Sequence, residues 1–397
     1  MAVSGNHNST VVAAVSAAAP RPIASGAPAS TKSESIRHLY VHIPFCARIC
    51  PYCAFYKELL DRSQTPRFCE AILRELHGAA SSLRPATIYF GGGTPTALTT
   101  AQLQFLLAGF HKELDLSELV EWTIEANPGS VSASKAALLR RLGINRISLG
   151  IQSWDDELLK LLGREHNAKQ AKQSFRVFRD AGFKNINVDL MFGLPGQTIG
   201  QWRDTLERTI KLAPEHISTY CLTYEEDTEF FLRHARGEYR QDEDADAEFF
   251  ETTMSMLETA GYQHYEISNY ARPGFRSAHN RGYWSGADYF GIGPSAFSTI
   301  GLTRWQNVSD FRRYSDAVLS GRSAIGSTEQ LSDEMKRTER IALSLRTDTG
   351  ADAKLLARSS EKTREFVQRG LLRKTRDHFV LTRAGKALAD SVAAELV

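Results

Sequence analysis

The chain has 397 residues, which is enough for a large core and for two or three domains. Hydrophobic residues make up 42% of it and charged residues 24%, a balance typical of globular proteins. The net charge of +2 argues against a nucleic-acid-binding protein, and no apolar run approaches the roughly 18–20 residues that span a bilayer.

The first 36 residues are dominated by Ala, Ser, Pro and Val and contain one acid, Glu34. A segment of this composition buries too little surface to offset its ordering entropy, so residues 1–36 are predicted to be a disordered extension. A transit peptide is also rich in serine and poor in acids, but only one arginine, Arg21, precedes Arg37. An organelle signal is therefore the alternative.

Short runs rich in Ile, Val, Tyr and Phe alternate with longer segments of helical periodicity. Six strands are predicted, at Leu39–Phe45, Thr87–Phe90, Trp122–Ala126, Arg146–Gln152, Asn185–Met191 and His216–Thr223. The helices expected between them are Arg67–Ala80, Thr100–Glu113, Ser132–Leu142, Ala168–Ala181 and Ile199–Leu212. This alternation predicts an α/β fold with a parallel sheet and right-handed crossovers, whose site would lie at the carboxyl ends of the strands.

The composition changes after Tyr224. The segment Glu225–Glu248 is strongly charged, which favours a surface linker and a helix, and a motif-rich block follows at Tyr262–Gly301. From about Ser327 the chain is helical and charged, and it ends in two short apolar runs. This ending indicates a small helical domain with a β-wing, which in the simplest case packs against the barrel.

Three of the five cysteines lie within eight positions. The five are Cys46, Cys50, Cys53, Cys69 and Cys221. An odd count with this clustering does not fit the disulfide framework of a secreted protein, and it indicates a metal site in a reducing compartment, the cytoplasm. No role is assigned to Cys69 and Cys221, which are expected to be buried structural thiols.

The spacing C-x3-C-x2-C places Cys46, Cys50 and Cys53 on one loop directly after a predicted strand. Thiolates are the ligands of iron–sulfur clusters, and three ligands on a four-iron cluster leave one iron open to a substrate or cofactor. A closed zinc site needs a fourth ligand, and the nearest candidate, His42, lies inside the preceding strand. A 4Fe-4S cluster is predicted, with a zinc site or three unligated thiols as the alternatives.

Glycines and polar residues follow the next strands. The glycines of Gly91–Pro95 allow the backbone to approach a ligand closely, although the segment could also be an ordinary tight turn. Glu125 lies in an apolar run and indicates either a cationic or hydroxyl ligand or a buried pair with Arg or Lys. The same argument applies to Gln152 and Asp189. Arg164 could bind a carboxylate, or it could be an exposed helical arginine.

The motif Y-x-H-I-P-F-C-x3-C-x-Y-C, from Tyr40 to Cys53, resembles the radical SAM superfamily. It is most similar to the branch that contains oxygen-independent coproporphyrinogen III dehydrogenase (HemN) and the HemW-type heme chaperones, and the resemblance extends from about Leu39 to Leu388. It implies a partial (β/α)6 barrel and a cluster whose open iron binds S-adenosylmethionine (SAM). It also implies electron transfer from a donor such as flavodoxin or ferredoxin, which cleaves SAM to a 5′-deoxyadenosyl radical.

The resemblance also implies which residues contact SAM. Matched to the motifs of the family, they are Tyr40, Tyr52, Gly92, Gly93, Thr94, Glu125, Gln152, Arg164 and Asp189.

Two segments distinguish the branches. HemN-type enzymes carry a further cysteine where this chain has Phe55, a difference that argues against coproporphyrinogen decarboxylation. HemW-type proteins carry H-N-x-x-Y-W, matched here by His279–Trp284. A lone histidine is more often structural, but imidazole and flat rings suit a heme, and the resemblance favours His279 as its ligand. Many relatives have a cysteine where this chain has Ser277. Because serine has no thiol, thiolate ligation from this position is excluded here.

The sequence therefore predicts four parts: the extension 1–36, a radical SAM barrel at 37–265, a segment with H-N-x-x-Y-W at 266–326, and a winged-helix-like domain at 327–397. The predicted function is that of a HemW-like heme chaperone, which binds heme and delivers it to an acceptor protein. The alternatives are coproporphyrinogen III dehydrogenase activity and a non-catalytic, cluster-dependent sensor or interaction protein. The sequence leaves open the acceptor, the turnover of SAM and the oligomeric state, a homodimer included.

Overall fold

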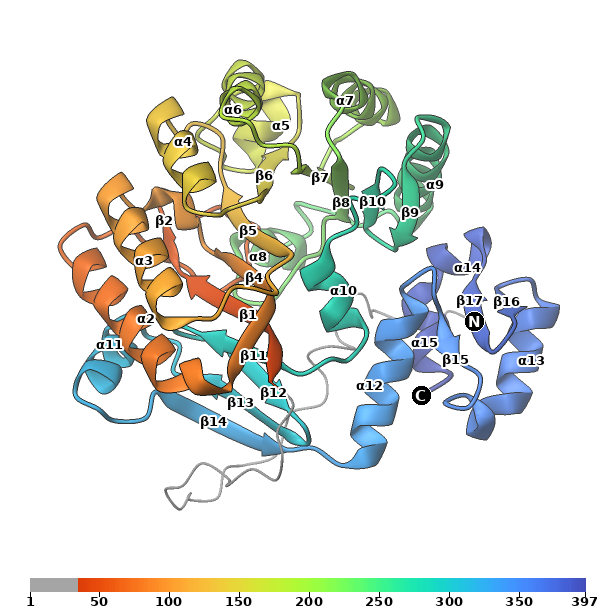
Figure 1. Cartoon of the computed structure of the whole chain (residues 1–397). Helices are drawn as coiled ribbons and strands as arrows, with labels where there is room; N and C mark the ends of the chain where they lie inside the picture. Colours follow the sequence, from red (N-terminus) through yellow and green to blue (C-terminus); the bar gives the residue numbers. More distant parts are fainter. Residues whose placement is uncertain (1–34) are drawn as a thin grey trace.

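A computed structural model describes residues 35–397 (Figure 1). Residues 1–34 of the predicted extension lie outside the described residues, and Ile36 already begins the first strand. The domain boundaries at 36, 265 and 326 stay predictions.

Six consecutive parallel strands form the centre of a twelve-stranded sheet, in the order β1-β4-β5-β6-β7-β8. They are β1 (Ile36–Ile43), β4 (Leu83–Gly92), β5 (Glu121–Ala126), β6 (Arg146–Gln152), β7 (Ile186–Phe192) and β8 (His216–Cys221). All six predicted strands are confirmed. The first one ends before its predicted bound, because Pro44 has no N–H to continue the ladder. Phe45 and Cys46 instead form a short strand, β2 (Phe45–Cys46), paired with β3 (Glu58–Leu59).

Helices cover the outer face of these strands (Figure 1). They are α2 (Thr65–Ala79), α3 (Thr100–Glu113), α4 (Ala133–Arg141), α5 (Asp156–Leu161), α6 (Ala168–Asp180) and α7 (Ile199–Leu212). The five predicted helices are confirmed, and only the short α5 was not predicted. Three helices begin with a capping box, formed by Thr99, Asn167 and Thr198, each with a glutamine three residues later. The partial β/α barrel is thereby confirmed.

Side chains alternate between the two faces along most of each barrel strand. Leu39, Val41 and Ile43 of β1 belong to the apolar core beneath the helices, whereas the intervening Tyr40 and His42 lie on the opposite face. The other strands repeat this pattern, so the inner face of the barrel is polar and aromatic. A polar interior is the composition expected of a chamber that holds a ligand.

Both edges of the parallel sheet are extended by strands that the sequence did not predict. The strand β11 (Tyr289–Ile292) adds to β1 as a seventh parallel strand and continues into antiparallel β12 (Phe297–Ile300), β13 (Thr303–Asn307) and β14 (Ile325–Gln330). At the other edge, β10 (Asn269–Ala271) and β9 (Gln263–Glu266) follow β8. The connecting helices are α8 (Glu229–Ala235), α9 (Glu243–Thr259), α10 (Ala278–Trp284) and α11 (Phe311–Leu319).

The C-terminal part has its own apolar core. Its elements are α12 (Asp333–Leu345), β15 (Ala351–Asp352), α13 (Ser360–Gln368), β16 (Leu372–Thr375), β17 (His378–Leu381), α14 (Arg383–Ala387) and α15 (Ala389–Ala394). The β16–β17 hairpin is the predicted wing. Arg346 connects this part to the barrel through an ion pair of 3.0 Å with Glu266, and Arg276 pairs with Asp348 at 2.7 Å.

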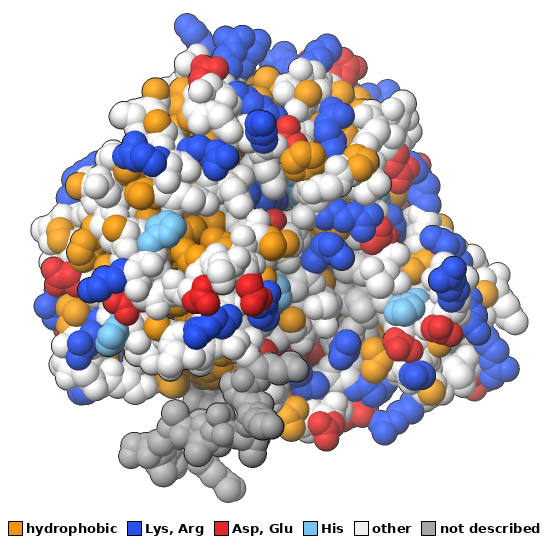
Figure 2. All heavy atoms as spheres, in the orientation of Figure 1, with side chains coloured by type: hydrophobic (Ala, Val, Ile, Leu, Met, Phe, Trp, Pro, Cys, Tyr) orange, Lys and Arg blue, Asp and Glu red, His pale blue; other side chains and the backbone are white. Residues whose placement is uncertain are grey.

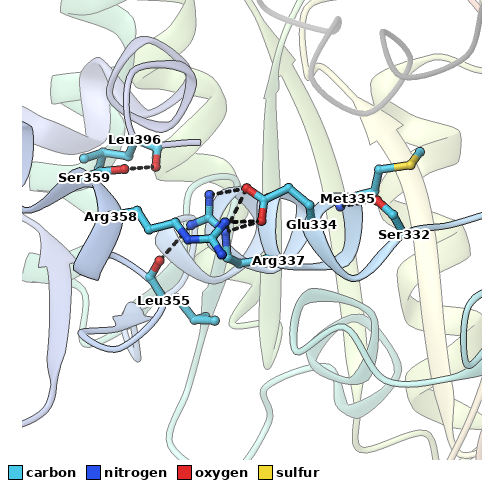
Figure 3. A network of polar contacts seen from close by, with 8 residues as sticks. All are labelled: Ser332, Glu334, Met335, Arg337, Leu355, Arg358, Ser359 and Leu396. Carbon is cyan, nitrogen blue, oxygen red and sulfur yellow. Dashed lines mark hydrogen bonds and ion pairs between the residues drawn. The ribbon is translucent and has the colours of Figure 1, made fainter.

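The start of α12 is fixed by polar contacts within the C-terminal part (Figure 3). Ser332 caps the helix, and Glu334 accepts hydrogen bonds from Arg337 at 2.8 Å and Arg358 at 2.6 Å. Arg337 also donates to the carbonyl of Leu355. The carboxylate of Glu334 is therefore hydrogen-bonded to residues within the C-terminal part.

Among residues 35–397, no helix is long and apolar enough to cross a bilayer. On the face shown in Figure 2, lysine and arginine side chains lie among acidic and apolar ones.

Candidate cofactor site and adjoining cavity

Of the three clustered cysteines, Cys46 ends β2, and Cys50 and Cys53 lie on the loop that follows it. A hydrogen bond of 3.2 Å from the N–H of Cys53 to the carbonyl of Cys50 closes this loop. The thiols are half-buried and form no disulfide. Burial raises the pKa of Cys46 to about 11 and also raises that of Cys53, while the guanidinium of Arg164 acts in the opposite direction. The Cys50 Sγ lies 3.5 Å from Nη1 of Arg164.

The donor set fits an iron–sulfur cluster better than a closed zinc site. His42, the nearest fourth ligand, uses both ring nitrogens: Nδ1 lies 3.0 Å from the Tyr40 hydroxyl and Nε2 lies 3.0 Å from the Tyr56 carbonyl oxygen. Within residues 35–397, no three His, Cys, Asp or Glu side chains group closely enough for a single metal ion. Three thiols beside the cation Arg164 match the ligands and the charge of a thiolate-bound cluster.

The glycines at the end of β4 allow the chain to pass close to the cysteine segment. Gly92 has φ +107°, and a Cβ there would lie 2.6 Å from the His42 ring. A Cβ on Gly93 would lie 2.4 Å from the carbonyl oxygen of Pro44. The hydroxyl of the next residue, Thr94, lies 3.6 Å from the Cys46 Sγ. Glycine is therefore required at these two positions because the backbone passes directly against the segment that precedes the cysteines.

Glu125 lies near the end of β5, with its carboxylate inside the barrel. It accepts hydrogen bonds from the Tyr89 hydroxyl at 2.7 Å and from the N–H of Gly92 at 3.2 Å. No Lys or Arg of the described chain forms an ion pair with it, so the structural pair considered above is not found. Burial, with an addition from Asp189, raises the pKa of Glu125 to about 7. Such a carboxyl group can bind a hydroxyl or cationic group of a ligand.

Arg164 lies in the loop after α5 and is half-buried, which excludes an exposed helical arginine. It donates to Asn127 Oδ1 at 2.5 Å and to the carbonyl of Gly150 at 2.8 Å. Asn127 in turn donates to the Thr94 hydroxyl at 2.8 Å. These contacts connect the glycine loop, the end of β6 and the cysteine loop into one network.

The remaining predicted contacts lie around this network. Gln152 ends β6 with φ +68°, a conformation uncommon outside glycine. Asp189 on β7 accepts from the Ser148 hydroxyl at 2.9 Å. Tyr52 packs on Phe230, with ring centroids 6.2 Å apart, and burial raises its pKa while Arg164 opposes this. A cavity of about 420 Å³ beside the cysteine loop is lined by Cys50, Thr94, Asn127 and Arg164, among others.

The H-N-x-x-Y-W motif lies on α10, which packs between β4 and α12 (Figure 1). The buried carboxylate of Glu121 accepts the N–H of Ala278 at 2.8 Å and the N–H of His279 at 3.0 Å. Ser277 caps the helix by accepting the N–H of Asn280, and it is fully buried. The residue that replaces the cysteine of many relatives therefore has a structural role.

His279 is held by a polar chain of three side chains. Its Nδ1 lies 2.9 Å from the hydroxyl of Thr87, which lies 2.8 Å from Nδ1 of His38. The His279 ring stacks on Tyr89 with centroids 5.1 Å apart. Burial lowers the pKa of His279 to about 3, so the ring is neutral at pH 7. Within residues 35–397 its Nε2 makes no hydrogen bond, and the residue lines a large cavity.

This cavity has a volume of about 750 Å³ and lies between the inner face of the barrel, α10, the β11–β13 strands and α12. Its aromatic lining consists of Tyr40, Phe55, Tyr56, Tyr89, Tyr283, Trp284, Tyr289 and Phe297. Phe55 is 71% exposed, Phe297 45% and Tyr283 37%, so large apolar side chains stand open around it. Size and lining together suit a large, flat, mostly apolar ligand.

Several residues of this site were not predicted from the sequence: His38, Thr87, Tyr89 and Glu121. They occupy inward-facing positions of β1, β4 and β5. Thr87 and Tyr89 lie inside a predicted strand, and the alternation of that strand is the signal that could have identified them, whereas His38 and Glu121 each lie one residue before the predicted start of their strand. The helix that they contact, α10, is distant in sequence, so the contacts themselves could not be predicted from the sequence.

Comparison with known proteins agrees with these features. The model of the Radical SAM superfamily matches residues 40–209. The protein named heme chaperone HemW in Bacillus subtilis is 35% identical over 371 residues, which cover 90% of this chain and 98% of that protein. Its counterpart in Escherichia coli is 40% identical over 267 residues, covering 66% of this chain and 70% of that protein.

A solved structure shares the fold. Coproporphyrinogen III oxidase (HemN) from Escherichia coli matches with a TM-score of 0.79 and 23% identity, over 91% of this chain and 90% of that one. The sequence identity to the HemW proteins is higher, and for the Bacillus subtilis protein the match extends over 98% of its length. The chain therefore belongs to the HemW family of the radical SAM superfamily.

Proposed function

We propose that this protein is a heme chaperone, which binds heme in the large cavity through Nε2 of His279 and transfers it to an acceptor protein. One observation carries the proposal: a neutral imidazole, held at Nδ1, lines an aromatic cavity of about 750 Å³ with its Nε2 unused by the described chain. Neutral imidazole is a common axial ligand of heme iron. The likeness to proteins named heme chaperone HemW supports the same conclusion.

The chain of hydrogen bonds at His279 is compatible with iron binding. For Nε2 to bind a metal, the ring proton has to be on Nδ1, from which it is donated to the Thr87 hydroxyl. That hydroxyl then donates its own proton to Nδ1 of His38. A single tautomer of each histidine satisfies both hydrogen bonds and leaves Nε2 of His279 free.

The same proposal assigns the cofactor site. Cys46, Cys50 and Cys53 would hold a 4Fe-4S cluster, and SAM would lie against the hydrogen-bond network of Arg164 and against the carboxyl group of Glu125. When bound, this pair of groups supplies one-electron chemistry at SAM. Arg164 balances the negative charge of the thiolates, and Glu125 accepts a hydroxyl or ammonium group. The remaining SAM contacts would be Tyr40, Tyr52, Gly92, Gly93, Thr94, Gln152 and Asp189.

The surroundings of the protein are part of the proposal. All five cysteines are free, which supports a reducing compartment, and we place the protein in the cytoplasm. A flavodoxin or ferredoxin would reduce the cluster. Phe55, at the cavity, stands where a HemN-type enzyme has a cysteine, and this favours the chaperone over porphyrinogen decarboxylation.

The test is anaerobic reconstitution with iron and sulfide, followed by heme titration of the wild type and His279→Ala. One heme per chain is expected for the wild type, with binding strongly weakened in the variant while the cluster absorbance is unchanged. His77→Ala, at a histidine whose side chain is 67% exposed, is the matched control and should bind as the wild type does. A wild type that ignores heme but decarboxylates coproporphyrinogen III with SAM would establish the enzyme instead. Binding of SAM without heme or porphyrin would favour the sensor.

A further inference from the structure

One wall of the large cavity comes from the C-terminal part of the chain. Lys336, Glu339, Ala342 and Leu343 of α12 line it, together with Arg346, which directly follows the helix. Their spacing of three or four residues places them on one face of the helix. The C-terminal part therefore contributes a helix face to the cavity in addition to packing against the barrel.

Most charges on the cavity wall neutralise one another. Arg304 donates to both carboxylate oxygens of Glu339, at 2.7 and 2.8 Å. Arg346 pairs with Glu266 at 3.0 Å and with Asp390 at 3.2 Å. Both acidic residues that line the cavity, Glu339 and Asp390, are used in these pairs.

Lys336 is the exception. It is half-buried at the cavity, and within residues 35–397 its ammonium group has no hydrogen-bond or ion-pair partner. The nearby acid Glu334 is engaged by Arg337 and Arg358 (Figure 3). An ammonium group that keeps three unused donors beside an apolar cavity is a binding partner for an anionic group of a ligand.

We propose that Lys336 binds a carboxylate of the macrocycle held in this cavity, so that the site selects a flat, anionic tetrapyrrole. The inference rests on the proposed heme binding and adds its second anchor. His279 on α10 would hold the iron, aromatic rings such as Tyr283 and Phe297 would contact the macrocycle, and α12 would hold a carboxylate at its edge. Recognition would then require the barrel and the C-terminal part together.

The experiment titrates the full-length protein with three probes: heme, heme dimethyl ester and metal-free protoporphyrin. The wild type should bind heme about tenfold more tightly than the ester, the range of one charge-assisted hydrogen bond. Lys336→Met should lose this difference, binding heme and protoporphyrin about tenfold more weakly and the ester as before. Lys336→Arg should restore it. Arg340→Met, one turn along α12 at an exposed position, is the matched control and should change nothing.

The two anchors can fail separately. His279→Ala should weaken heme but not protoporphyrin, because only heme offers an iron, whereas Lys336→Met should weaken both. Wild-type affinity for heme in Lys336→Met, or equal wild-type affinities for heme and its ester, would overturn the carboxylate anchor and leave the heme chaperone intact. Absence of heme binding by the wild type would overturn both proposals. Equal thermal unfolding of wild type and Lys336→Met would exclude misfolding as the cause of a loss.

Discussion

The buried carboxylate of Glu121, at the start of β5, holds the backbone of His279 by accepting its N–H at 3.0 Å. The same carboxylate accepts the N–H of Ala278 and the hydroxyl of Ser277. An acid of the barrel therefore caps the short helix α10 and fixes the position of the imidazole relative to the cavity. The position of the H-N-x-x-Y-W motif therefore depends on a residue about 160 positions earlier in the chain.

Glu121→Gln is expected to weaken heme binding and to lower the free energy of unfolding by about 1–3 kcal/mol, because an amide replaces one of the two charged acceptor oxygens in a buried site. Heme titration and urea unfolding measure the two effects. Glu118→Gln, an exposed residue three positions earlier, is the control, and loss of its surface ion pair should cost less than about 1 kcal/mol. Unchanged heme affinity in Glu121→Gln would show that α10 needs no cap from the barrel.

Thr87→Val removes the hydroxyl between His38 and His279 and keeps the shape of the side chain. The Nδ1 proton of His279 then has no acceptor, so the tautomer with a free Nε2 is no longer favoured. Heme affinity is expected to fall about tenfold, the usual size of an effect on a residue behind a metal ligand. Thr87→Ser should restore the affinity. Because protoporphyrin has no iron, its binding should not change, and an equal loss for both probes would instead mean that the cavity itself has been deformed.

Gly282→Ala tests the contact between α10 and β1. A Cβ at Gly282 would lie 2.2 Å from the ring of His38, and at this distance the ring cannot keep its present position. The variant should displace His38 or α10 and should lose heme binding, measured by titration. Gly78→Ala is the matched control, since Gly78 is helical and has open space around it, and there alanine should stabilise by about 0.5–1 kcal/mol. Full heme binding by Gly282→Ala would show that the contact between Gly282 and His38 is not needed for heme binding.

Much of the barrel was predictable because its information is local. Buried parallel strands such as Arg146–Gln152 are apolar runs, and helices such as Ala168–Asp180 begin at capping residues. The strand β11 was missed because it has four residues and finds its partner, β1, about 250 positions away. No local pattern specifies such a pairing.

The site divides in the same way. The cysteines and the H-N-x-x-Y-W segment are short motifs, and the sequence alone identifies them. The connection from His38 through Thr87 to His279 joins two barrel strands to the helix α10, and these segments are far apart in the sequence. The cavity wall formed by α12 could not be predicted from the sequence either. In the sequence Lys336 resembles any solvent-exposed lysine, and only the fold shows that the acidic residues near it are paired with other residues.

Acid is expected to destabilise the fold below about pH 6.5. Burial lowers the pKa of six histidines among residues 35–397, to about 4 for His42 and His166 and to about 3 for His264 and His279; the other two are His38 and His216. Between these values and 6.5 the unfolded chain binds protons that the folded chain does not, so stability falls as the pH falls. Each histidine contributes up to about 1.4 kcal/mol per pH unit. Urea unfolding at pH 7, 6 and 5 measures the slope, and a midpoint independent of pH would contradict this account.

Glu125 should act in the opposite direction. Its pKa is raised from 4.5 to about 7, so the folded state favours the protonated carboxyl, and stability is lost as the pH rises from 4.5 through 7. Glu125→Gln, which cannot ionise, should therefore stabilise the protein without its cofactors by about 1–3 kcal/mol at pH 8 and by much less at pH 5. SAM binding by the reconstituted variant should weaken, because the carboxylate that would accept a ligand hydroxyl or ammonium group is gone. Glu70→Gln, at an exposed position of α2, should leave both properties unchanged. If Glu125→Gln were equally destabilised at pH 5 and pH 8, the loss of the hydrogen bonds to Tyr89 and Gly92 would account for the effect. The buried negative charge of Glu125 would then not destabilise the folded protein.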